Sequence, residues 1–152
     1  DGTSLWTLTA SEDFARPFVN LLGNDRALGE AFHITSDEAC TWDQILTAMA
    51  EGLSVEPRLV HVPTDTLVRC NPAWAGPLLG DKAWCATFDN SKVKRAAGDF
   101  TCEISMREQL ARAGAAADRI LAGFEPDAVN QALTDQIIEQ QEAVGRQERT
   151  RR

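Results

Sequence analysis

Residues 84–95 read WCATFDNSKVKR, and this stretch passes directly from an apolar, strand-like run into a basic, helix-like segment. Asp89 and Ser91 stand at the junction, where a carboxylate or a hydroxyl can accept hydrogen bonds from the free N–H groups of a helix start. Gly98 follows at a position typical of a helix end. The stretch therefore predicts a capped turn after the apolar run and a helix that runs to about Ala97.

The same alternation continues along the rest of the chain. Strand-like patterns predict three short strands, at residues 4–9, 31–35 and 58–62. Helical patterns predict helices from Ser11, after Thr41, over 65–68, over 103–121 and from Pro126. This alternation indicates an α/β domain. A sheet of three short strands would leave an edge at which a further strand could pair.

Two of the predicted helices have more detailed signals. Thr41 and Gln44 have the spacing of a capping box, in which each residue caps the backbone of the other. Four apolar residues of that helix should form its buried stripe, namely Ile45, Leu46, Met49 and Leu53. In the last helix the stripe is expected at Val129, Leu133, Ile137 and Val144. A basic tail with Arg146, Arg149, Arg151 and Arg152 follows and is expected to be a solvated end.

Charge and composition exclude several classes of partner. The chain has 152 residues and a formal net charge of −8, so a surface for nucleic acid is not expected, because phosphate binding requires clustered Lys and Arg. No apolar run approaches the roughly 20 residues that span a bilayer, so no membrane partner is expected.

The four cysteines are widely separated and are interpreted as reduced thiols of a cytoplasmic protein. The first residue is Asp rather than Met, so we expect a processed chain or part of a larger product.

Sequence motifs for catalysis are missing. The chain contains no glycine-rich phosphate loop, no G-x-S-x-G elbow and no tyrosine. His33 and His61 each lie in a strand-like run, where a structural histidine is the expected reading. No cysteine or histidine has metal-ligand spacing. We therefore assign no catalytic, cofactor-binding or metal-binding residue within this chain.

The tract from Asn71 to Trp84, NPAWAGPLLGDKAW, is the candidate binding segment. It combines Trp74 and Trp84 with Asp81 and Lys82 in a long connection, and long connections in compact domains are often functional. Tryptophan rings offer flat apolar faces to a sugar or a base, and the charged pair offers polar anchors. The alternative is a loop without a binding role, whose aromatic residues pack against the core. The sequence favours neither the binding segment nor this structural loop.

Four stretches in order resemble the C-terminal half of the extended short-chain dehydrogenase/reductase family, the NAD-dependent epimerases and dehydratases. The first stretch, WTLTASEDFARPFVNLL, resembles a strand of the family with an acidic residue, here Asp13, and the helix after it. The second, GEAFHITSDEACTWDQILTAMAEGL, resembles the next strand and helix, and the third, RLVHVP, resembles a further strand. FDNSKVKRAAGDF has Asp89, Ser91 and Lys92 in register with the family's last element. The likeness covers residues 1 to about 124.

The resemblance implies the C-terminal portion of an extended Rossmann-type enzyme, with few short strands and several packing helices. Residues 1–124 would be a substrate-binding part, and residues 125–152 an amphipathic helix with a basic tail. The N-terminal Rossmann half, which is missing here, would bind NAD or NADP and supply the catalytic Tyr and Lys, so this chain alone should bind no cofactor. Lys92 is not that lysine. The bases Lys92, Lys94 and Arg95 should lie on the exposed side of a helix that packs over the nucleotide-binding half.

The implied substrate is a small molecule such as a nucleotide-sugar. The sugar epimerases of this family bind the nucleotide diphosphate through an arginine-containing pattern, which residues 64–79 do not reproduce. Arg69 is the nearest basic candidate for this contact. With Trp74, Asp81, Lys82 and Trp84 it completes the candidate substrate-binding set. The isolated chain is expected to self-associate through faces that the other half would cover. The alternative function is a non-catalytic module that docks a partner through its sheet edge or its tail helix.

Overall fold

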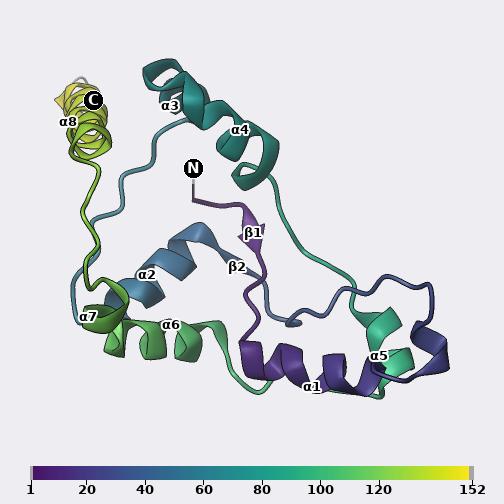
Figure 1. The fold of residues 1–152 in the computed structure, drawn as a ribbon. Helices are drawn as coiled ribbons and strands as arrows, with labels where there is room; N and C mark the ends of the chain where they lie inside the picture. The colour runs from purple at the N-terminus through teal and green to yellow at the C-terminus, as the bar shows by residue number, and fades with distance from the viewer. Residues whose placement is uncertain (1, 151–152) are drawn as a thin grey trace. The chain divides into compact units, whose positions relative to one another are not determined.

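The computed structural model describes residues 2–150, with side chains described as far as residue 146. The chain divides into two compact units, each considered by itself (Figure 1). The larger unit comprises Thr3–Pro57 and Cys85–Ala117, and the smaller unit comprises Arg58–Trp84 with the chain from Asp118 onward.

The larger unit is mostly helical around a very small sheet. Its elements are β1 (Leu5–Trp6), α1 (Ser11–Leu21), the 3-10 helix η1 (Asp25–Ala27), β2 (Cys40–Thr41), α2 (Trp42–Gly52), α5 (Ser91–Ala97) and α6 (Met106–Ala115). β1 and β2 pair antiparallel, with Leu5 opposite Thr41. On the other side of β1, Ala86 forms a parallel bridge with Trp6 and donates its N–H to the Leu5 carbonyl at 2.7 Å. The apolar run that begins the 84–95 stretch therefore lies beside β1.

The observed fold is richer in helix than the predicted three-stranded α/β domain. Within residues 2–150 the strands are β1 and β2 alone, and the predicted strands at 31–35 and 58–62 do not form. Strands need neighbouring backbone to satisfy their polar groups. Around residues 31–35, side chains of the 84–95 stretch do so instead, since the Asn90 amide donates to the Thr35 carbonyl and the Lys92 ammonium to that of Ala31.

The capping box at the start of α2 is confirmed. Thr41 Oγ1 accepts the Gln44 N–H at 3.2 Å, and Gln44 Oε1 accepts the Thr41 N–H at 2.9 Å. The predicted buried stripe is mostly wrong, because only Ile45 of its four residues is buried, and the other buried positions are alanines, Ala48 and Ala50. Small residues face inward because another helix crosses α2 at close range.

That helix is α6, and two glycines permit the crossing. A Cβ built on Gly114 would collide with the backbone of Gly52, and one on Gly52 would lie 2.7 Å from the Leu110 carbonyl oxygen. The core of the larger unit forms here, from Cys40, Ile45, Ala48, Met106 and Leu110. Trp6 and Trp42 pack against this core with ring centroids 5.3 Å apart, so the sheet and the helix pair share one apolar cluster.

The single helix predicted over 103–121 is divided into α6 and α7 (Ala117–Ile120). It also starts later than predicted, because Ser105 caps α6 by accepting the Glu108 N–H at 3.2 Å. The N–H groups of Glu103 and Ile104 donate to a side chain instead of being left free at a helix start.

The smaller unit consists of short helical turns and one long helix. These are α3 (Thr64–Cys70), the 3-10 helix η2 (Pro72–Trp74), α4 (Ala75–Pro77), the π-helical turn η3 (Leu78–Lys82) and α8 (Ala128–Thr150). α3 contacts α8. Ile137 is the fully buried member of the predicted stripe, whereas Val129 and Val144 are exposed. Of the predicted basic tail, Arg146 is exposed and pairs with Glu142 at 3.7 Å, and the side chains of Arg149, Arg151 and Arg152 lie outside the described residues.

None of the helices described within residues 2–150 combines the length and the apolar character that crossing a lipid bilayer requires.

The α2–α6 crossing leads to a stability prediction for Gly114→Ala. The added methyl group has no space against the Gly52 backbone, so the free energy of unfolding should fall by about 1–3 kcal/mol, the usual cost of overpacking. Gly76→Ala is the matched control, because a Cβ there meets open space and should change stability by less than about 1 kcal/mol. Urea unfolding followed by circular dichroism measures both, and equal responses would contradict the close crossing.

Candidate functional site

Asp13 anchors the start of α1 to a distant part of the chain. Its carboxylate, only 1% exposed, accepts the N–H groups of Glu103 at 3.1 Å and Ile104 at 2.9 Å. It also pairs with Arg16, whose guanidinium reaches Glu103 at 2.6 Å and the Thr101 carbonyl at 3.2 Å. The acidic residue of the first stretch thus fixes the segment that leads into α6.

The surroundings of Asp13 lower its pKa. Burial alone would raise the pKa, but the N–H groups of Ile104 and Glu103, together with Arg16, favour the charged form and hold it below the ordinary value. The group is therefore ionised at neutral pH and has a structural role.

The helix of the opening stretch is confirmed as α5, with Gly98 at its end in a positive-φ conformation (φ 89°). Asp89 Oδ1 accepts the Ser91 N–H at 2.8 Å, as the cap prediction requires. The other end of α5 was not predicted to be capped by side chains. Three side chains from α1 and the segment after it donate to its last carbonyls: Asn20 to Ala97 at 3.1 Å, Asn24 to Ala96 at 2.7 Å and Arg26 to Arg95 at 3.5 Å.

Of the three basic residues of α5, Lys92 and Arg95 are exposed, as predicted, and Lys94 is half-buried. All three also have a partner within the larger unit. Their acceptors are Glu30 for Lys92 at 2.6 Å, Asp37 for Lys94 at 2.8 Å and the Ser91 hydroxyl for Arg95 at 3.1 Å. Hydrogen bonding to Lys94 is the leading reason why the pKa of Asp37 is lowered. Each charge has a local partner, so α5 is not a basic patch.

The candidate substrate-binding residues all belong to the smaller unit. The tract from Asn71 to Trp84, which holds all of them except Arg69, was predicted to be a long connection without helices, but it folds as the consecutive turns η2, α4 and η3. Asn71 begins these turns by accepting the Ala73 N–H at 3.1 Å, and Pro72 occupies the first helical position, where its missing N–H does no harm.

The structure brings Asp81, Lys82 and Trp84 together. Lys82 pairs with Asp81 at 3.1 Å, and the Trp84 indole N–H donates to the Leu79 carbonyl at 2.6 Å. This bond orients the indole while Trp84 stays 67% exposed, so the residue presents an apolar face to solvent. Arg69 lies on α3, where it donates to Thr66 Oγ1 at 3.0 Å, and Trp74 is half-buried at the end of η2.

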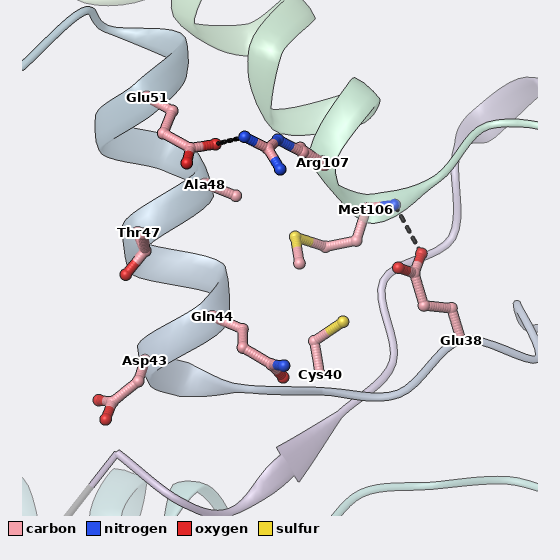
Figure 2. Close-up of a pocket in the computed structure, with 9 residues that line it drawn as sticks. All are labelled: Glu38, Cys40, Asp43, Gln44, Thr47, Ala48, Glu51, Met106 and Arg107. Carbon is pink, nitrogen blue, oxygen red and sulfur yellow. Dashed lines mark hydrogen bonds and ion pairs between the residues drawn. The ribbon is translucent and has the colours of Figure 1, made fainter.

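A hollow of about 420 Å³ lies between α2 and the start of α6 in the larger unit (Figure 2). Its lining comprises Glu38, Cys40, Asp43, Gln44, Thr47, Ala48, Glu51, Met106 and Arg107. Two of its carboxylates are already engaged, since Glu38 accepts the Met106 N–H at 2.7 Å and Glu51 pairs with Arg107 at 2.8 Å. Burial, followed by the charge of Glu38, raises the pKa of the Cys40 thiol, which therefore stays protonated and unreactive.

Sequence patterns did not predict this hollow. Its residues come from 38–51 and 106–107, which meet only because α2 and α6 cross. The glycines at positions 52 and 114 are the one signal of that crossing in the sequence, and isolated glycines near helix ends are ordinarily interpreted as terminators. Among the described residues, no group of three or more His, Cys, Asp or Glu side chains is arranged to hold a metal ion.

Comparisons with known proteins assign no family to the chain. A scan against protein-family models finds no match, and searches of curated proteins and of solved structures find none either. Function therefore rests on the residues and on their geometry.

The Asp13 anchor leads to a pH-dependent stability prediction. A carboxylate whose pKa is lowered by folding stabilises the protein above its unfolded pKa, and that stabilisation is lost as the pH falls through the folded pKa. Asp13→Asn should lose about 2 kcal/mol of unfolding free energy at neutral pH, through the weakened hydrogen bonds and the lost ion pair. When the pH is lowered below about 4, the free energy of unfolding should fall less for Asp13→Asn than for the unchanged protein.

Urea unfolding at neutral and acid pH measures both effects. Asp99→Asn, at an exposed carboxylate of the same unit, is the control and should behave like the unchanged protein. Parallel pH profiles for Asp13→Asn and the unchanged protein would show that Asp13 does not stabilise the fold through its charge.

Proposed function

We propose that the chain is the substrate-binding part of an NAD- or NADP-dependent cytoplasmic enzyme of the extended short-chain dehydrogenase/reductase kind, an epimerase, dehydratase or reductase. In this proposal a Rossmann half binds the dinucleotide and supplies the catalytic Tyr and Lys. The present chain binds and orients a nucleotide-sugar or a related small molecule. The order of the four stretches supports this proposal, as does the buried Asp13 at the acidic position of the first stretch.

The observation that carries the proposal is the two-sided character of α1. On one side, Asp13 and Pro17 are fully buried within the larger unit. On the other, Phe14 and Phe18 stack with ring centroids 5.6 Å apart yet remain 42% and 46% exposed. Val19 and Leu22 continue this apolar surface and are more exposed still.

A helix that is held in place on one side and exposes a cluster of large apolar residues on another commonly meets a second layer or a partner there. The nucleotide-binding half is the second layer that this proposal supplies for α1. The sheet of that half would pack against Phe14, Phe18 and the apolar residues that follow them. Asp13 would hold the other side of α1 to the larger unit.

On the substrate side, the proposal assigns binding roles to the smaller unit. The exposed ring of Trp84 would lie against the sugar, and Asp81 and Lys82 would exchange hydrogen bonds with its hydroxyl groups. Arg69 would contact a phosphate. These residues bind and orient the substrate, and no proton transfer by tyrosine is assigned to a chain that contains none.

A second candidate function is a docking module that uses the tail helix. Val129 is 80% exposed on α8, and Val144 is also exposed, so the helix keeps apolar residues outside the unit that it helps to build. A partner helix could cover them. The first proposal is preferred because the exposed apolar residues of α1 include two stacked aromatic rings.

The proposal makes a prediction about the coding sequence ahead of Asp1. It should encode a strand followed by a glycine-rich turn and, later, a Tyr-x-x-x-Lys pair, because the dinucleotide and the proton relay need those groups. Sequencing the gene upstream of the Asp1 codon checks this, and a start codon immediately before Asp1 would contradict it. Calorimetry is the companion measurement: the chain alone should give no saturable heat with NAD or NADP, whereas the extended protein should.

The substrate side is tested by Trp84→Ala. A nucleotide-sugar should quench the tryptophan fluorescence of the unchanged chain, and the variant should bind it roughly tenfold more weakly, the equivalent of about 1.4 kcal/mol. Trp84→Phe should retain part of the affinity because it keeps an aromatic face. Leu121→Ala, at an exposed apolar residue of the same unit, is the control. Equal affinities for Trp84→Ala and the control would remove Trp84 from the site.

The uncovered surface of α1 is tested by Phe18→Ser. The isolated chain should bind an apolar fluorescent dye and self-associate in sedimentation, since exposed aromatic residues promote both. Phe18→Ser should reduce dye binding and association. Leu28→Ser, at an exposed leucine outside α1, should leave them largely unchanged. A monomer without dye binding would argue against a surface that requires a second layer.

A further inference from the structure

No further inference is drawn: the strongest candidate, the exposed apolar face of α1 formed by Phe14, Phe18, Val19 and Leu22, already belongs to the proposed function, and nothing in the structure shows what covers it.

Discussion

The buried carboxylate of Asp13 determines how the larger unit is assembled. It accepts the N–H groups of Glu103 and Ile104, almost a hundred residues away in sequence, and so fixes the chain just before α6 begins. α6 can then cross α2 at the glycine contact, and the apolar core and the hollow beside it both follow from that crossing. Since two backbone donors and an arginine surround it, the charge of Asp13 is compensated within the unit.

Local signals in the sequence predicted the helices well. The capping box of Thr41 and Gln44, the Asp89 cap and the Gly98 terminator all form as expected, because each depends on residues only a few positions apart. Strands were predicted poorly. Alternating apolar residues show which side chains can be buried, but a strand also needs a neighbour, and residues 31–35 find side-chain donors instead.

In the candidate sites, too, contacts between residues close in sequence could be predicted, whereas contacts between distant segments could not. Asp81, Lys82 and Trp84 are close in sequence, so their grouping in one turn could be predicted. The hollow between α2 and α6 could not, because it depends on a crossing between segments about sixty residues apart. The partners of the α5 lysines were not predicted, for a related reason. Their acidic partners, Glu30 and Asp37, lie in a segment whose path the sequence pattern does not define.

The hydrogen bonds from Asn20, Asn24 and Arg26 to the last carbonyls of α5 have a mechanical consequence. They tie the last turn of α5 to Asn20 of α1 and to Asn24 and Arg26 just after that helix. A displacement of α1 would therefore act on α5, whose Lys94 contacts Asp37, as does Asn90 just before the helix.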